Sequence, residues 1–155
     1  MTHLILKYLH VLGAIVILGT GTGIAFFMLM AHRSGDAAHI ARTAQSVVLA
    51  DWLFTATAVA LQPVTGWLLA REAGFALTEG WIVLSLLLYI VAGALWLPVV
   101  WMQRRMRDLA GRAAASGMPL PAAYHRLYRL WFACGIPGFG CVAAIVWLMV
   151  ARPAL

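Results

Sequence analysis

Charged residues are scarce in this chain of 155 residues. Asp, Glu, Lys and Arg make up 10% of it, and hydrophobic residues make up 64%. A soluble globular domain carries roughly a quarter charged residues, so the composition excludes an ordinary soluble protein. Cysteine is also scarce: Cys134 and Cys141 would lie about 10 Å apart along one helix, too far for a disulfide. The composition places the chain in the membrane class, as a single domain over residues 1–155.

Four apolar runs cover most of the chain, at about 4–31, 47–70, 80–102 and 127–151. Each is near or above the ~20 residues with which a helix crosses ~30 Å of hydrocarbon. The first run looks like a secretory signal, but it is about twice as long as a normal signal core and lacks a convincing cleavage pattern. We therefore expect a retained helix there. The sequence predicts an all-α integral membrane four-helix bundle.

Basic residues are distributed unevenly between the connections. Eight arginines, in and around 31–45 and 103–129, fall on one side of the predicted membrane, and Lys7, Arg71 and Arg152 fall on the other. The positive-inside rule then predicts that both termini face outward from a bacterial inner membrane. The cytoplasmic arginines would contact anionic lipid. A nucleic-acid partner is not expected, because no aromatic-interleaved basic surface accompanies the arginines.

His10 lies inside the first apolar run, in the stretch LKYLHVLGAIVILGTGTG. Ionisable residues within a membrane are costly and usually functional, although a neutral histidine also serves as a hydrogen-bonding link between helices. Helical spacing puts Gly13, Ala14 and Ile17 on the same face as His10, where small residues leave room for a flat ligand. This pattern favours haem b with His10 as the iron ligand, since imidazole is a common axial ligand.

Other candidate residues are predicted to surround the same site. Lys7 lies one helical turn outward from His10, and together with Arg71 it is placed to contact haem propionates; plain snorkelling to the interface also explains Lys7. Gln62 and Ser85 are polar residues expected at the depth of His10. A bis-histidine haem within one chain is excluded, because three other histidines are predicted at the opposite end of the spans, on the order of 30 Å from His10: His32, His39 and His125.

Three local patterns concern packing. Asp51 lies just inside the second span, and we expect it to form an ion pair with Arg104 or Arg105 of the third. Gly19 and Gly23 form a G-x-x-x-G pair, which favours close helix contact and a homodimer. The tryptophans near the span ends are expected to anchor the helices at the membrane interface: Trp52, Trp81, Trp101, Trp131 and Trp147.

Much of the chain resembles the bacterial integral-membrane family called domain of unknown function 2269, in the stretches LKYLHVLGAIVILGTGTGIAFFMLMAHRSGD, VVLADWLFT, LYIVAGALWLPVVWMQRRMRDLA and YHRLYRLWFACGIPGFGCVAAIVWLMVARP. This family name carries no activity. A more distant resemblance, carried by Lys7 and His10, is to the four-helix membrane protoporphyrinogen oxidases, which are haem b proteins. Their third-span lysine aligns with Ser85, which argues against that reaction here and leaves haem binding through His10 as the implied property.

Together these patterns predict a b-type haem protein that transfers electrons, with a membrane quinone such as ubiquinone in a lateral pocket. Prolines inside three spans favour kinks that open such a pocket: Pro63, Pro98 and Pro137. If the protein is an enzyme, we expect a haem-dependent, quinone-linked oxidoreductase. Two alternatives stay open. One is a small proton-linked transporter using His10, Gln62 and Asp51; the other is a structural subunit of a membrane complex without a cofactor.

Overall fold

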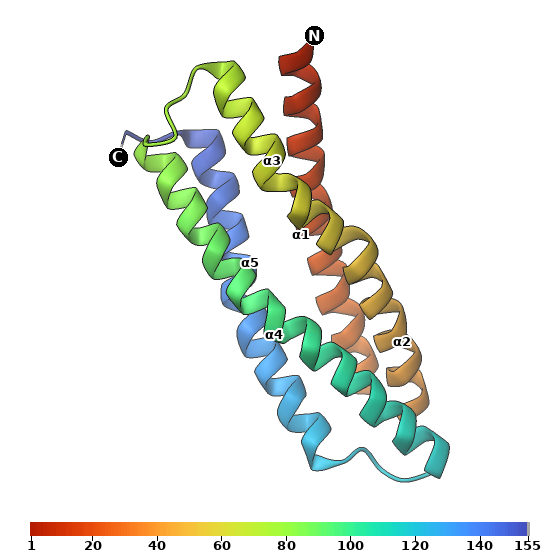
Figure 1. Cartoon of the computed structure of the whole chain (residues 1–155). Helices are drawn as coiled ribbons and strands as arrows, with labels where there is room; N and C mark the ends of the chain where they lie inside the picture. Colours follow the sequence, from red (N-terminus) through yellow and green to blue (C-terminus); the bar gives the residue numbers. More distant parts are fainter. Residues whose placement is uncertain (155) are drawn as a thin grey trace.

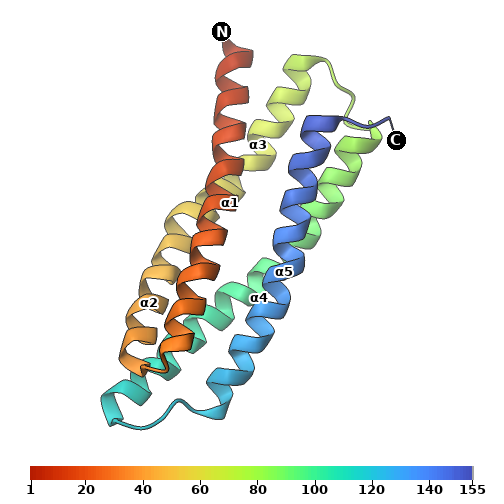
Figure 2. The same cartoon turned by 180° about the vertical axis from the view of Figure 1, so that it is seen from behind.

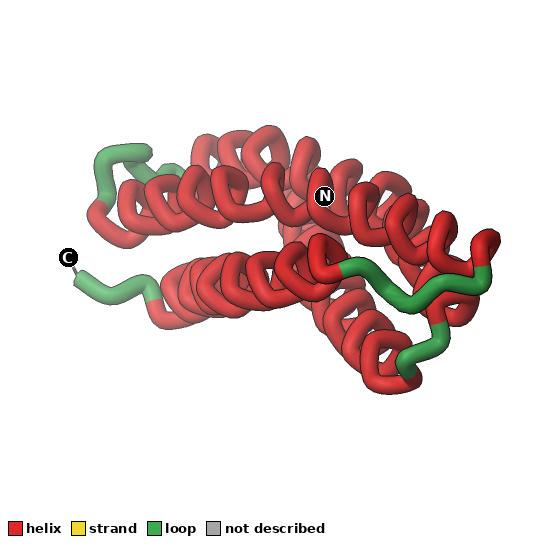
Figure 3. Tube along the Cα trace, turned by 90° about the horizontal axis from the view of Figure 1, so that it is seen from below, coloured by secondary structure: helices red, strands yellow, loops and turns green. Residues whose placement is uncertain are grey.

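The computed structural model describes residues 1–154, and all of its regular elements are helical (Figure 3). They are α1 (Thr2–Ser34), α2 (Ala37–Ala50), the π-helical turn η1 (Asp51–Thr55), α3 (Ala56–Ala73), α4 (Gly80–Ser116) and α5 (Ala122–Ala151). Because α2, η1 and α3 run on as one helix, four helices are long and apolar enough to cross a membrane. The predicted all-α membrane bundle is confirmed, and its helices extend beyond the apolar runs.

Glycines end three of the helices. Gly35, Gly74 and Gly117 follow α1, α3 and α4 with φ of 68°, 76° and 66°. This left-handed conformation is one that glycine adopts without the steric cost of a Cβ atom. Helix α4, the third of the membrane-crossing helices, therefore ends at Ser116. The segment SGMPLP, residues 116–121, predicts this end.

The basic connection 31–45 is mostly helical, which its polar composition did not predict. Only Gly35 and Asp36 lie between α1 and α2. The Asp36 carboxylate accepts a 2.8 Å hydrogen bond from the backbone N–H of Ala38 and so caps the first turn of α2. The alanine-rich sequence that follows continues the helix.

Both chain ends lie at the same end of the bundle (Figure 1). We call this the terminal end. The opposite end, with the Gly35–Asp36 turn and the connection 117–121, is called the basic end. This arrangement follows from an even number of antiparallel crossings.

The helices pack differently at the two ends. Near the basic end, α1, α2, α4 and α5 enclose the main core, whose largest fully buried side chains are Met28, Ile40, Met106 and Tyr124. Toward the terminal end the helices pair, α1 with α3 and α4 with α5, as Figure 2 shows. A small cluster of Ala70, Trp81, Ile82 and Leu148 joins the two pairs again. The stretch between the two clusters contains a cavity, described below.

Truncating the main core is expected to destabilise the bundle. Met106 is fully buried, so Met106→Ala should lower the free energy of unfolding by about 2 kcal/mol, the lower end of the range for soluble cores. We expect this low value because a side chain that leaves the core meets lipid that is equally apolar. The mutation then removes mainly packing contacts. Thermal unfolding in detergent, followed by circular dichroism, measures this. Leu97→Ala on the exposed face of the same helix is the control, and an equal loss there would contradict the prediction.

Candidate functional site

His10 lies between α1 and α3, close to the terminal end. Its ring Nδ1 is 2.9 Å from Oγ1 of Thr65. Gly66, the next residue on α3, lies against the ring, and a Cβ added there would lie 3.1 Å from the His10 Cε1 atom. The absence of a side chain at Gly66 therefore lets the imidazole approach the α3 backbone.

Thr65 determines which ring nitrogen of His10 carries the proton. The Thr65 hydroxyl donates its single proton to the backbone oxygen of Leu61, at 2.9 Å, as threonines in membrane helices commonly do. With that proton directed to Leu61, the Thr65 oxygen can accept a hydrogen bond from His10, and we assign the ring proton to Nδ1 on this basis. Nε2 keeps its lone pair, and residues 1–154 supply no hydrogen bond to it. A neutral imidazole held through one nitrogen with the other one free is the form in which histidine binds a metal.

Gln62 links the same two helices one turn earlier on α3. Its Nε2 donates a 2.9 Å hydrogen bond to the backbone oxygen of His10. This amide lies against Gly13, where an added Cβ would be 2.5 Å from the Gln62 Nε2 atom. Gly13 thus belongs to the helix contact rather than to an open face for a ligand.

A side chain at Gly13 is expected to break this contact. Gly13→Ala should displace the terminal amide of Gln62, which an added Cβ would approach to 2.5 Å, and the lost hydrogen bond should leave this variant about 0.5–1.5 kcal/mol less stable than Gly140→Ala. Gly140→Ala in α5 is the matched control, because a Cβ there meets nothing within 4 Å and alanine favours the helix by about 0.5–1 kcal/mol. Unfolding in detergent measures both. Equal behaviour of the two variants would contradict the prediction.

A cavity of about 470 Å³ lies between the α1–α3 and α4–α5 pairs. It begins one turn beyond His10 along α1, at Ala14, and continues past Ile17. Gln62 contributes from α3 and Tyr89 from α4. The walls are mostly apolar. The structure therefore brings Ala14, Ile17 and Gln62 together around one cavity. His10 is not among the residues that line it.

The other predicted site residues lie elsewhere. Ser85 is buried but donates its hydroxyl to the backbone oxygen of Trp81, at 2.7 Å, and it does not line the cavity. Lys7 is exposed on α1. The Arg71 guanidinium lies 5.0 Å from the centre of the Trp67 ring. Both cations are at the terminal end, as predicted, but neither contacts His10.

Asp51 does not form the expected ion pair. One of its oxygens accepts a 3.3 Å hydrogen bond from Nε1 of Trp96, and Arg104 instead stacks over the Trp52 ring at 4.9 Å. Among the described residues the ion pair present is Arg107–Asp108. The ion-pair prediction is wrong because Asp51 points into the bundle, where it is 3% exposed, whereas Arg104 and Arg105 lie on the outer surface of α4.

The interfacial explanation also fails for two tryptophans. Trp131 is 5% exposed and lines the cavity. Trp81 is 9% exposed, and its Nε1 donates to Glu79 at 2.7 Å. By contrast, Trp52, Trp101 and Trp147 are largely exposed, as anchors at the interface should be. Position near a span end does not determine which face of a helix a residue occupies.

Sequence reasoning missed Thr65 and Gly66 as neighbours of His10. The signal was present, since they follow Gln62 at spacings of three and four and therefore share its helix face. Only the pairing of α1 with α3 shows that this face meets His10. The glycines of the G-x-x-x-G pair remain open, because a Cβ at Gly19 or Gly23 meets nothing within 4 Å; the homodimer stays a prediction.

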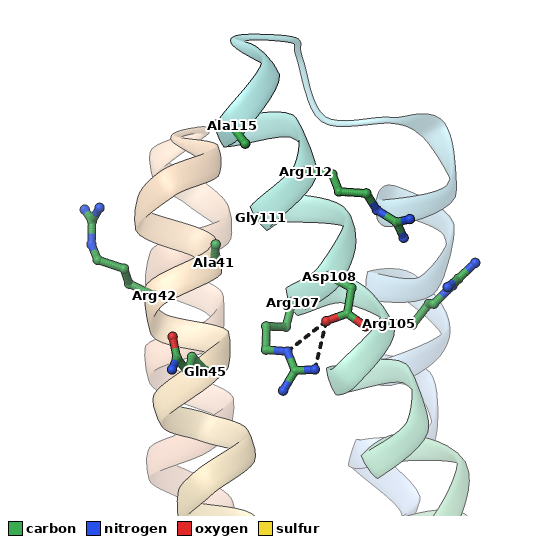
Figure 4. A pocket seen from close by; sticks show the side chains of 9 residues that line it. All are labelled: Ala41, Arg42, Gln45, Arg105, Arg107, Asp108, Gly111, Arg112 and Ala115. Atoms are coloured by element: carbon green, nitrogen blue, oxygen red, sulfur yellow. Dashed lines mark hydrogen bonds and ion pairs between the residues drawn. The ribbon is translucent and has the colours of Figure 1, made fainter.

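The basic end carries a separate group of aromatic and charged residues. His32 stacks on Tyr128 with ring centres 3.7 Å apart and contacts His125 edge-on, so these histidines lie far from His10, as predicted. A groove between α2 and α4 is lined by Arg42, Arg105, Arg107 and Arg112, among others. Figure 4 shows the Arg107–Asp108 pair at this groove, with the Arg42 side chain extending to one side and those of Arg105 and Arg112 to the other. The groove is basic, but its four arginine side chains do not converge on one ligand position.

Four helices are long and apolar enough to cross a membrane, and both chain ends lie at the terminal end of the bundle. These features define a four-helix integral membrane protein, whose environment is the lipid bilayer. The chain belongs to the family described as predicted integral membrane protein DUF2269, whose model matches residues 4–153. No curated protein and no solved structure gives a significant match to the chain.

Proposed function

We propose that this protein binds b-type haem through His10 and exchanges electrons with a membrane quinone such as ubiquinone, in a bacterial inner membrane with both termini outside. The observation that carries the proposal is the state of His10. Its Nδ1 lies 2.9 Å from Oγ1 of Thr65, and its Nε2 has no hydrogen-bond partner within residues 1–154. Metal-binding histidines almost always donate the N–H of the other ring nitrogen to an acceptor of this kind.

The residues around His10 fit a haem-binding role. Nε2 of His10 would be the axial ligand, and bound haem would supply one-electron chemistry. Lys7 and Arg71 are the cations available at the terminal end to neutralise propionates. Ala14 and Ile17 form an apolar wall directly beyond the histidine.

The cavity supports the quinone part of the proposal. Its volume of about 470 Å³ falls within the range of roughly 300–1,000 Å³ found for small-molecule sites. Its walls are apolar, with a few polar groups, and it lies between membrane helices. A redox partner for an intramembrane haem must itself dissolve in the bilayer, and a quinone meets that requirement.

A visible spectrum tests the proposal. Protein purified in mild detergent from haem-replete cells is expected to show a Soret band that shifts on reduction with dithionite. Pyridine haemochrome analysis should give about one haem b per chain or per dimer. A colourless preparation that also fails to bind added haemin would overturn haem binding.

The transporter alternative is favoured by one specific observation. Asp51 and Gln62 line the same cavity and are the beginnings of a polar path. In that case the protein would be colourless, and liposomes containing it would dissipate a pH gradient upon addition of substrate. A structural subunit would show neither behaviour.

A further inference from the structure

Four buried polar atoms around the basic-end side of the cavity lack hydrogen-bond partners within residues 1–154. They are Oδ2 of Asp51, Oγ1 of Thr55, Oε1 of Gln103 and Nε1 of Trp131. Each of these residues is at most 6% exposed, and all four line the cavity. The Thr55 hydroxyl lies near enough to the Asp51 carboxylate to interact with it, whereas Gln103 Oε1 and Trp131 Nε1 have no hydrogen-bond partner in the described part of the chain. Burying a polar group without a partner costs roughly 1–3 kcal/mol, so these last two atoms in particular indicate that a polar ligand binds beside them. We call the four atoms the inner polar site.

The backbone also departs from regular geometry at this position. Asp51 and Thr55 are the first and last residues of the π-helical turn η1, and such turns occur frequently at functional sites. Gln103 comes from α4 and Trp131 from α5. The inner polar site is thus built by three different helices, which only the folded bundle brings together.

The donor and acceptor types limit what can bind. Asp51 Oδ2 and Gln103 Oε1 accept hydrogen bonds, the indole N–H of Trp131 only donates, and the Thr55 hydroxyl does either. An ammonium group has no lone pair and would leave Trp131 unsatisfied. A hydroxyl group both donates and accepts, and therefore satisfies members of both kinds.

We propose that the inner polar site binds the hydroxyl-bearing ring of a lipid-soluble hydroquinone, whose apolar chain lies in the rest of the cavity. Trp96 and Phe132 supply aromatic walls beside the polar atoms, against which a ring stacks favourably. Ring hydroxyls donate to Asp51 and Gln103, and Trp131 donates to a ring oxygen. The assignment deepens the quinone part of the proposed function by placing the head group away from His10, toward the basic end.

Calorimetric titration of the intact protein in nanodiscs tests this inference without relying on haem. The probe is decylhydroquinone, compared with decylbenzene and decylamine and corrected with empty nanodiscs. The variants are Gln103→Leu, which removes the amide at similar volume, and Trp131→Phe, which removes the indole N–H and keeps a smaller aromatic ring. Gln45→Leu, an exposed glutamine of α2 outside the cavity, is the matched control.

Decylhydroquinone is expected to bind more tightly than either comparison compound. Gln103→Leu and Trp131→Phe should each weaken its binding about 5- to 20-fold, with no change for Gln45→Leu. Equal binding of decylbenzene, tighter binding of decylamine, or unchanged affinity in both variants would overturn the inference. Because a folding defect would also lower affinity, the circular dichroism of each variant must match the parent. A protein that neither contains nor binds haem but binds decylhydroquinone overturns the haem proposal alone, whereas a haem-loaded protein that binds it with unchanged affinity in both variants overturns this inference alone.

Discussion

Replacing His10 by alanine is expected to abolish the Soret band of the purified protein, or to lower haem content at least tenfold. The reason is that Nε2 of His10 is the ligand nitrogen in the proposed site, and Thr65 holds the ring in the form that presents it. Loss of the metal–nitrogen bond removes the main specific contact to the cofactor, and apolar walls alone do not replace it. Absorbance and pyridine haemochrome content, per mole of protein, measure the effect.

The matched control is His125→Ala, at the basic end, where the imidazole is exposed and contacts His32 edge-on. This variant should keep the full band. His10→Gly with added imidazole distinguishes ligation from folding, since free imidazole entering the space should restore part of the band. A full Soret band in His10→Ala would contradict the ligand assignment, as would equal loss in both alanine variants.

Thr65→Val is expected to weaken haem binding about 10- to 100-fold, the usual effect of removing an outer-shell partner of a metal-binding histidine. Valine keeps the shape of threonine but has no oxygen to accept the proton of His10 Nδ1. The ring then loses the contact that selects its tautomer and orientation. Haemin titration of the apoprotein, followed at the Soret band, measures the affinity.

Thr65→Ser is the control for this second prediction, because serine retains the hydroxyl and should bind haem within a few-fold of the parent. The midpoint potential gives an independent readout, since the Nδ1 hydrogen bond raises the basicity of the ligand. The valine variant should shift the potential and the serine variant should not. Equal affinity and equal potential in all three proteins would show that Thr65 does not position His10.

The depth of residues in the membrane was predictable from the sequence, because helix rise is constant. Gln62 and His10 are far apart along the chain, yet they contact each other as their predicted depths imply. The separation of His32 from His10 along α1 follows from the same constant rise per residue. The orientation of side chains around each helix was less predictable, since in a span that is apolar on every side the periodic contrast between faces is weak.

Asp51 and Trp131 show this difference most clearly. From their depth alone, Asp51 was expected to meet an arginine of the third span and Trp131 to anchor at the interface. Asp51 begins a π-helical turn, which alters the register of the helix faces before and after it, whereas Trp131 lies in the regular helix α5. Both side chains instead border the cavity.

The sequence by itself determined that this is a membrane protein of four helices with both ends together, because length, apolar content and glycine ends act locally along the chain. The pairing of α1 with α3, the cavity between the pairs and the inner polar site were decided by the tertiary structure. The physical reason is that lipid solvates every apolar face about equally. Which faces meet therefore depends on close packing and a few hydrogen bonds between distant residues, such as that from Gln62 to the backbone of His10.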